Sequence, residues 1–184
     1  LYVALPNSLH AEYAERALKK GVHVLCEKPL ALTEAECQRL VDASERSGAT
    51  LMTAYRLHFD QANLKAVKLA RERLGDLKLF HSVFSFSIRD KNNIRLRAEE
   101  GGGPLWDIGI YCINAARYFF RDEPLEVTAL DAGGDSRFRE VPAALAVSLR
   151  FPGDRLASFL VSFAAGESSA YDVVGTKGRI HMEA

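Results

Sequence analysis

The first third of the chain alternates short apolar runs with stretches of helical apolar spacing, and this order constrains the fold most strongly. The apolar runs have the length of strands and cover residues 1–5, 22–26 and 49–54. The first helical stretch ends at Gly21, a residue type that commonly follows a helix. The second opens with the capping box Thr33-Glu34-Ala35-Glu36 and ends at Gly48. Strands that alternate with helices across short connections predict a parallel, doubly wound sheet.

From about residue 57 the pattern changes. Asp60 is predicted to cap a helix that stops at Gly75, and another helix is predicted over Pro104–Phe120. The run after Gly75 has period two, with Phe80 and Phe84 on one face. Further strand-like runs cover residues 126–132, 144–151, 156–164, 170–174 and 179–183. Because no helices separate these runs, the predicted fold class is α/β: a doubly wound parallel sheet followed by an α+β unit with an open antiparallel sheet.

The composition is that of a globular protein and excludes several classes of function. The 184 residues are 48% hydrophobic and 26% charged, with a net charge of zero. Since the two signs are mixed along the chain, neither a nucleic-acid surface nor a basic membrane-binding helix is predicted. No apolar run approaches the roughly 20 residues of a membrane-spanning helix. Cys26, Cys37 and Cys112 are far apart and odd in number, which is typical of a reducing, cytoplasmic compartment.

Lys28 stands between Glu27 and Pro29, directly after the second apolar run. A lysine in this position serves packing poorly, but ligands of open α/β sheets bind at the carboxyl ends of the strands. Lys28 is therefore a candidate active-site residue. The alternative is a solvated charge in a surface loop, which is the usual role of a single lysine.

Three blocks of sequence carry a resemblance to a known family. They are Pro6-Asn7-Ser8-Leu9-His10, the run from Gly21 to Pro29, and the run from Gly101 to Tyr111. In order and spacing they resemble the family of glucose–fructose oxidoreductase, inositol dehydrogenase and MocA-type proteins (Gfo/Idh/MocA), across essentially the whole chain. The resemblance implies an oxidoreductase that uses NAD or NADP and transfers a hydride between the nicotinamide and a hydroxyl or carbonyl group of a sugar or cyclic polyol.

The resemblance also implies how the chain is divided. Residues 1–56 correspond to the C-terminal part of an NAD(P)-binding Rossmann domain, and residues 57–184 to a substrate-binding and oligomerisation domain with an incomplete C-terminus. No G-x-G-x-x-G occurs in the chain, although such a phosphate loop belongs at the first strand of a Rossmann fold. We therefore expect a fragment that lacks the N-terminal dinucleotide-binding segment. Two alternatives stay open, a non-catalytic binding or assembly protein and a truncated, cofactor-free remnant.

Lys28, Tyr111 and Asp107 are the predicted catalytic residues. Oxidation of an alcohol needs a group that takes the proton, and an ammonium beside a phenol favours the phenolate. Asp107 and Tyr111 are four residues apart on a predicted helix, so Asp107 can orient Lys28 or accept a hydrogen bond from a substrate hydroxyl. The structural alternatives are a charge at a helix N-terminus for Asp107 and a core aromatic for Tyr111. Many members of the family carry histidine where Tyr111 stands; the tyrosine resembles the glucose–fructose oxidoreductase and dimeric dihydrodiol dehydrogenase branches, so a trans-dihydrodiol is the alternative substrate.

The resemblance places six residues at the nicotinamide cofactor, namely Pro6, Asn7, His10, Glu27, Lys28 and Pro29. Local structure offers an alternative for three of them. Asn7 can cap a helix, His10 can lie in its first turn, and Glu27 can form an exposed ion pair. Pro29 resembles a rigidifying proline that follows a cis peptide bond.

Arg56, Arg95 and Arg97 are candidates for binding a polyhydroxylated or anionic substrate, because a guanidinium donates fork-like pairs of hydrogen bonds. Together with the two predicted catalytic residues on the helix, Asp107 and Tyr111, they form the predicted substrate site. Each arginine taken alone is more often a solvated surface charge. The histidines and cysteines show no zinc-site spacing, so no metal is predicted.

Two further features concern loops and assembly. Gly101-Gly102-Gly103 is either a flexible loop tip or a place where the backbone passes close to a ligand. The strands over residues 126–174 have no helices between them to cover both faces of their sheet, and an uncovered apolar face marks a protein interface. The resemblance also implies a homodimer or homotetramer through this sheet. The predicted partners are a small-molecule substrate and further copies of the chain, with no nucleic acid and no membrane.

Overall fold

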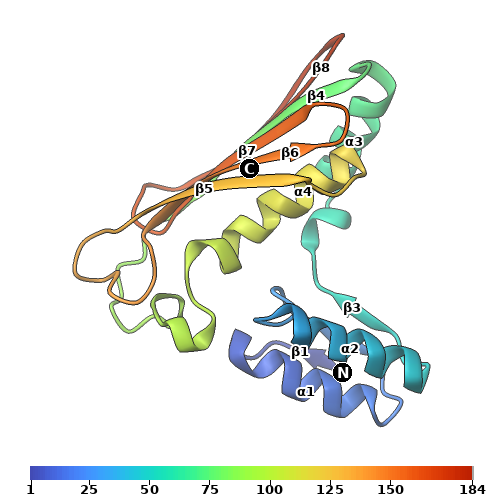
Figure 1. Cartoon of the computed structure of the whole chain (residues 1–184), viewed down its shortest axis with the longest axis vertical. Helices are drawn as coiled ribbons and strands as arrows, with labels where there is room; N and C mark the ends of the chain where they lie inside the picture. Colours follow the sequence, from blue (N-terminus) through green and yellow to red (C-terminus); the bar gives the residue numbers. More distant parts are fainter. Residues whose placement is uncertain (184) are drawn as a thin grey trace.

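The computed structural model describes residues 1–183 and contains two α/β units (Figure 1). The N-terminal unit is built on a small parallel sheet, and the C-terminal unit on a sheet of six strands. Residues 54–60 connect the units and contain a 3₁₀ turn, Arg56–His58, so the boundary predicted after residue 56 lies within this connection. The predicted fold class, part of a doubly wound parallel sheet followed by an α+β unit, is confirmed. Within residues 1–183, no helix is long and apolar enough to cross a membrane.

The N-terminal unit has three parallel strands, which lie in the order β1 (Tyr2–Val3), β2 (Val24–Cys26) and β3 (Leu51–Thr53). Helices α1 (His10–Leu18) and α2 (Glu34–Ser47) connect them and pack side by side against one face of the sheet (Figure 1). Their apolar faces and the strands enclose a small core that includes the fully buried side chains of Ala14, Leu18 and Leu40.

Local sequence signals explain where these helices end and where α2 begins. Thr33 Oγ1 accepts a hydrogen bond from the Glu36 N–H, and the Glu36 side chain accepts from the Thr33 N–H, both at 3.2 Å, which completes the predicted capping box. Gly21 and Gly48 follow α1 and α2 with φ of +72° and +69°, a conformation that glycine adopts without a Cβ clash. The start of α1 differs from the prediction, because residues 7–9 form a 3₁₀ turn and Asn7 caps nothing.

The C-terminal unit has a mixed sheet with the spatial order β5-β6-β7-β4-β8-β9. Its strands are β4 (Leu77–Ser85), β5 (Glu126–Ala132), β6 (Ala144–Phe151), β7 (Arg155–Ser162), β8 (Ser168–Gly175) and β9 (Gly178–Glu183). The predicted antiparallel pairing holds with one exception, since β4 and β7 run parallel in the centre of the sheet. Hairpins fix the direction of β5, β6 and β7 relative to one another, whereas no hairpin joins β4 to β7, so their relative direction is free of that constraint.

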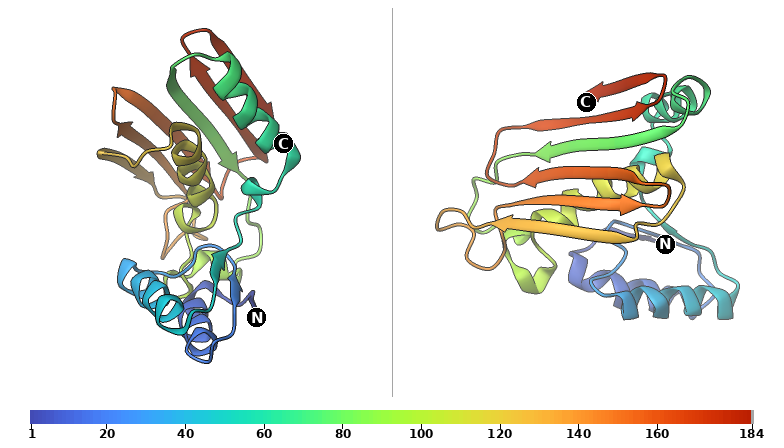
Figure 2. Two further views of the ribbon diagram at one scale, coloured as in Figure 1. Left: turned by 90° about the vertical axis from the view of Figure 1, so that its right-hand side faces the viewer. Right: turned by 45° about the horizontal axis from the view of Figure 1, so that its top comes forward.

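Helices α3 (Gln61–Arg73) and α4 (Ile110–Phe120) cover one face of the large sheet and leave the other face bare (Figure 2). As predicted, Asp60 caps α3, and its side chain accepts a hydrogen bond from the Asn63 N–H at 2.9 Å. The core between helices and sheet contains almost fully buried aromatic side chains, among them Phe80, Phe151, Phe159 and Phe163. On the bare face, large apolar side chains remain exposed, namely Leu79, Leu130, Leu156 and Leu160.

Candidate active site

Lys28 lies between the two units, where the loop after β2 meets the segment that leads into α4. Strand β2 ends at Cys26, so Lys28 stands at its carboxyl end as predicted. Its Nζ donates to Oδ1 of Asp107 at 2.7 Å and to the main-chain carbonyl oxygen of the same residue at 2.8 Å. The two side chains are only 12% and 13% exposed. Lys28 is therefore a shielded, hydrogen-bonded ammonium group, and its alternative as a solvated loop charge is wrong.

Asp107 lies in a π-helical turn, Leu105–Gly109, that leads into α4. The sequence predicted one continuous helix from Pro104 and missed this turn, in which the Ile110 N–H donates to the carbonyl five residues earlier. Short π-helical turns occur frequently at functional sites. Here the turn presents both the carboxylate and the main-chain carbonyl of Asp107 to one ammonium group.

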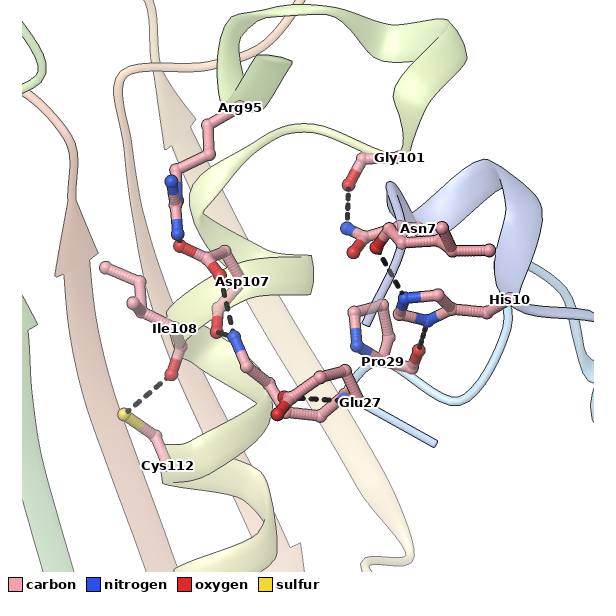
Figure 3. A network of polar contacts seen from close by, with 11 residues as sticks. Asn7, His10, Glu27, Pro29, Arg95, Gly101, Asp107, Ile108 and Cys112 are labelled. Atoms are coloured by element: carbon pink, nitrogen blue, oxygen red, sulfur yellow. Dashed lines mark hydrogen bonds and ion pairs between the residues drawn. The ribbon is translucent and has the colours of Figure 1, made fainter. Parts of the chain in front are cut away.

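The Asp107 carboxylate is shared between two cations. Arg95 Nε donates to Oδ2 at 2.6 Å (Figure 3), while Lys28 is bound to Oδ1. Burial acts to raise the pKa of Asp107, but the charge and hydrogen bond of Lys28, together with those of Arg95, outweigh it and hold the pKa below its ordinary value of 3.8. Asp107 is thus a carboxylate whose two oxygens are both engaged by protein groups. Of its two predicted roles, this geometry favours orienting Lys28 over binding a substrate hydroxyl.

Tyr111 follows Asp107 by about one turn and lies beside the same lysine. The centroid of its ring is 4.9 Å from Lys28 Nζ, so the ammonium lies over the ring face. Tyr55 and Phe84 surround the ring, with centroid separations of 6.4 and 5.9 Å. The three predicted catalytic residues are therefore neighbours. Within residues 1–183, Nζ approaches the ring and forms no hydrogen bond with the phenol oxygen.

Asn7 and His10 lie close to this centre but face other parts of the protein. Asn7 Nδ2 donates to the carbonyl oxygen of Gly101 at 3.0 Å, which explains why its side chain does not cap α1. His10 is fully buried, with Nδ1 2.7 Å from the Pro29 carbonyl oxygen and Nε2 2.8 Å from that of Leu5. The ring therefore connects the segments that follow β1 and β2. Contact of either residue with the cofactor stays a prediction.

Glu27 and Pro29 shape the loop on either side of Lys28. Glu27 accepts hydrogen bonds from the Tyr2 hydroxyl and, at 3.3 Å, from the main-chain N–H of Lys28, in place of the predicted exposed ion pair. Pro29 is almost fully buried, and the Lys28–Pro29 peptide bond is cis. Pro6 directly precedes the 3₁₀ turn, and its carbonyl oxygen accepts from the Leu9 N–H at 2.9 Å. The predicted cofactor contacts of these residues stay predictions.

The three arginines of the predicted substrate site have different surroundings. Arg95 is held by Asp107, so it acts on the site through that carboxylate. Arg56 and Arg97 are exposed, and neither guanidinium is bonded to another side chain in the part of the chain that the structure describes. Their role in binding substrate stays a prediction.

Two features of the site were not predicted from the sequence. Tyr55 packs against the Tyr111 ring, and burial raises its pKa to about 12, which keeps it a neutral phenol. Its place directly after β3, at the same edge as Lys28, was a signal that could have indicated it. The hydrogen bond between Ser8 Oγ and Glu100 Oε2, at 2.6 Å, joins residues too distant in sequence to be paired by any motif. Hollows of the surface lie on the bare face of the large sheet and beside α4. The candidate site itself is defined by charge and position.

Comparisons with known proteins assign both units to one family. Residues 1–55 match the family model of an oxidoreductase family with an NAD-binding Rossmann fold, and residues 65–181 match that of the GFO/IDH/MocA C-terminal domain. D-xylose 1-dehydrogenase (NADP+) 2 of Haloferax volcanii is 34% identical over 185 residues, which cover 98% of this chain and 55% of that protein. The chain spans about half the length of the curated relatives it matches.

The fold of the chain is also similar to that of solved structures. Aldose-aldose oxidoreductase from Caulobacter crescentus, complexed with glycerol, has a TM-score of 0.95 and 39% identity over 99% of this chain and 55% of its own. A 3-ketoreductase from Actinomadura kijaniata, in complex with NADP and TDP-benzene, has a TM-score of 0.89 and 30% identity over 99% of this chain and 56% of its own. Family models, relatives and structures agree over both units. The chain belongs to the Gfo/Idh/MocA family of oxidoreductases.

Proposed function

We propose that the whole protein is an NAD- or NADP-dependent oxidoreductase that transfers a hydride between the nicotinamide and a hydroxyl-bearing carbon of a sugar or related cyclic polyol. One observation carries the proposal. A shielded lysine ammonium, fixed by two oxygens of Asp107, lies beside the Tyr111 ring at the carboxyl edge of a parallel sheet. The relatives support the substrate class, since they include proteins named for xylose and for deoxysugar nucleotides.

The residues at this edge fit the nicotinamide half of a dinucleotide. Lys28 and Tyr55 stand at or just beyond the carboxyl ends of β2 and β3, which is where open α/β sheets bind such ligands. The bound nicotinamide supplies the hydride chemistry, which side chains of proteins lack. This chain carries no glycine-rich phosphate loop, so its own residues would contact the nicotinamide half alone.

Lys28 holds the reacting oxygen in this mechanism. An ammonium has three donors, and Asp107 takes two of them, which leaves the third N–H for the substrate oxygen. The positive charge, shielded from water, stabilises the negative charge that develops on this oxygen as its proton leaves. Asp107 orients Lys28, and it stays ionised because its own pKa is lowered.

Tyr111 exchanges the proton with the substrate hydroxyl. Its ring packs against the Lys28 ammonium, so Tyr111 and the group that holds the reacting oxygen lie in one site. General acid–base catalysis of this kind contributes about 10²- to 10⁴-fold to a rate. Arg56 and Arg97, whose guanidinium groups are exposed, are proposed to bind the remaining hydroxyl groups of the substrate.

We also propose where the protein acts and how it assembles. The three cysteines are free and two of them are buried, which fits a reducing compartment and a cytoplasmic enzyme. The bare face of the large sheet is proposed to pair two or four copies of the protein.

The test is an assay of the whole protein with NAD+ and NADP+ against aldoses, cyclic polyols and a trans-dihydrodiol. We expect reduced nicotinamide to form with at least one aldose or polyol. Tyr111→Phe removes the proton-transferring hydroxyl and retains the ring, so it should lower kcat about 10²-fold or more with little change in folding. Turnover of the trans-dihydrodiol alone would replace the sugar as substrate, and no turnover by a folded, cofactor-binding protein would contradict the proposal.

A further inference from the structure

A glycine loop and a polar turn join the two units near the Lys28–Asp107 bridge. Asn7 Nδ2 donates to the Gly101 carbonyl oxygen at 3.0 Å, and Ser8 Oγ donates to Glu100 Oε2 at 2.6 Å. One partner of each pair belongs to the N-terminal unit and the other to the C-terminal unit. Figure 3 shows the side chain of Asn7 directed at Gly101 across the gap between the two chain segments. The contact is therefore made between units and not within either of them.

The glycine at residue 101 allows the loop to come this close. Its φ is +69°, and a Cβ built there would overlap the Leu32 side chain and lie 3.1 Å from the Cβ of Asn7. Both neighbours belong to the N-terminal unit. Glycine therefore lets two segments of the protein come close to each other, whereas the sequence suggested that the backbone comes close to a ligand.

The close neighbours of Gly102 belong to its own loop. A Cβ at this position would lie 2.5 and 2.6 Å from the carbonyl oxygens of Arg95 and Arg97. The N–H groups of Gly102 and Gly103 donate to the carbonyls of Arg97 and Arg95 at 3.0 and 2.8 Å. These bonds fold the loop back on itself and fix the direction in which Gly101 points.

The chain segments on both sides of this contact lead directly to the candidate site. From Gly103 the chain enters the π-helical turn that carries Asp107. On the other side, His10 lies three residues after Asn7, and its Nδ1 is 2.7 Å from the carbonyl oxygen of Pro29, next to Lys28. A displacement at Gly101 would therefore move Asp107 relative to Lys28.

We propose that Asn7, Ser8, Glu100 and Gly101 form a latch between the units that positions Lys28 against Asp107 for the reaction. The proposal rests on the proposed function for its catalytic consequence, and on the contacts alone for its structural part. The four are positioning residues, because they act through Lys28 and Asp107. They set the distance between the side of the site that faces the cofactor and the side that carries Tyr111.

The decisive variant is Gly101→Ala, and the chain offers a matched control. Gly48 has the same φ of +69°, but a Cβ there meets nothing within 4 Å. Gly48→Ala therefore has the same backbone strain without the collision. In the whole protein, Gly101→Ala is expected to lower kcat about 10- to 100-fold with little change in KM, since a misplacement of about 1 Å can cost 10²-fold. Equal kcat values for the two variants would overturn the latch.

A second substitution separates the latch from a local strain effect. Leu32→Ala removes the side chain that the added methyl group would overlap. If the latch is correct, Gly101→Ala combined with Leu32→Ala recovers most of the lost kcat, so the two substitutions are strongly non-additive. A double variant as slow as Gly101→Ala alone would contradict it.

Hydrogen exchange tests the latch without an assay of activity. In the 184-residue chain, peptides that cover residues 5–11 and 97–104 should exchange about tenfold faster in Gly101→Ala than in Gly48→Ala, with β6 unchanged. Unchanged exchange in both peptides would overturn the latch even if kcat fell. Faster exchange in a protein that oxidises no sugar or polyol would support the latch contact and disprove the proposed function.

Discussion

The two sheets of the molecule are covered in the same way but differ in size. Each has one face covered by two helices and one bare face (Figures 1 and 2). In the small sheet the strands have two or three residues, and in the large sheet they have six to nine. The small sheet contributes to the site through loops at the ends of its strands. The large one contributes through a helix that begins against its surface.

This difference between the sheets explains what makes the site rigid. Lys28 is carried by a loop, and its position depends on bonds that other segments make with that loop, such as the one from His10 to Pro29. Asp107 is carried by a π-helical turn that packs on the large sheet, where a Cβ at Gly109 would lie 3.5 Å from Phe159. The rigid element therefore holds the carboxylate, and the ion pair holds the loop against it.

The bare faces also differ. In the small sheet, Tyr2, Leu25 and Met52 are aligned across the three strands and exposed. In the large sheet, the row formed by Leu130, Ala146, Leu160 and Val83 crosses four strands. Leu130 and Leu160 in this row are 77% and 49% exposed. The larger apolar face is the better candidate for an interface between copies of the protein.

Breaking the ion pair between Lys28 and Asp107 should have the largest effect on activity. Lys28→Met in the whole protein removes the ammonium and keeps most of the side-chain volume, and we expect kcat/KM to fall about 10²- to 10³-fold. The fold should persist, because Arg95 still pairs with the Asp107 carboxylate. Lys68→Met is the control, since Lys68 forms an ion pair at the surface and its side chain is 73% exposed. Normal turnover of Lys28→Met in a folded protein would remove Lys28 from the mechanism.

A charge on the large bare face should break the proposed assembly. Leu160→Glu places a carboxylate in the centre of the apolar row, and burying an unpaired charge costs several kcal/mol. We expect the whole protein to sediment as a dimer or tetramer at micromolar concentration and the variant to sediment as a monomer. Leu125→Glu is the control, because Leu125 is 64% exposed and lies just outside β5. A wild-type monomer, or an assembly that survives Leu160→Glu, would rule out this face.

The 184-residue chain by itself should bind a dinucleotide weakly. Pyrophosphate binding depends on N–H groups of a glycine-rich turn at a helix N-terminus, and this chain carries no such turn. Trp106 reports on the site, since it is the one tryptophan of the chain, lies next to Asp107 and is 41% exposed. Titration of the 184-residue chain with NADPH should give no saturation of its fluorescence at micromolar concentration. Micromolar affinity would show that residues we have not assigned hold the pyrophosphate.

The smallest expected effect is a dependence of stability on pH. Because the pKa of Asp107 is lower in the folded protein than its ordinary value of 3.8, the carboxylate contributes stability above that value. The contribution is lost as the pH falls through the lowered pKa. Wild type and Asp107→Asn should therefore differ in free energy of unfolding by a constant amount from neutral pH down to about pH 5, and by less below about pH 4. A difference that grows on acidification would contradict the lowered pKa.

Much of the fold could be predicted because its signals are local. The capping box at Thr33, the glycines at 21 and 48 and the cap at Asp60 depend on residues a few positions apart, and all are present in the structure. Periodicity likewise located the strands of the large sheet to within a few residues. The parallel pairing of β4 with β7 could not be predicted in this way, since it joins segments about 75 residues apart with no local signal for their direction.

The features of the candidate site likewise separate into those set by near neighbours in the sequence and those set by long-range contacts. The sequence alone determined that Lys28 stands at the end of a strand, and that Asp107 and Tyr111 share a face, because strand ends and helical spacing depend on near neighbours. Only the tertiary structure decided that Lys28 bonds to two oxygens of Asp107, that Arg95 takes the other carboxylate oxygen, and that Gly101 meets Asn7. These contacts join residues 12 to 94 positions apart. Lys28 and Asn7 meet their partners only when the two units pack together, whereas Arg95 meets Asp107 when the C-terminal unit folds. No periodicity or cap encodes either kind of packing.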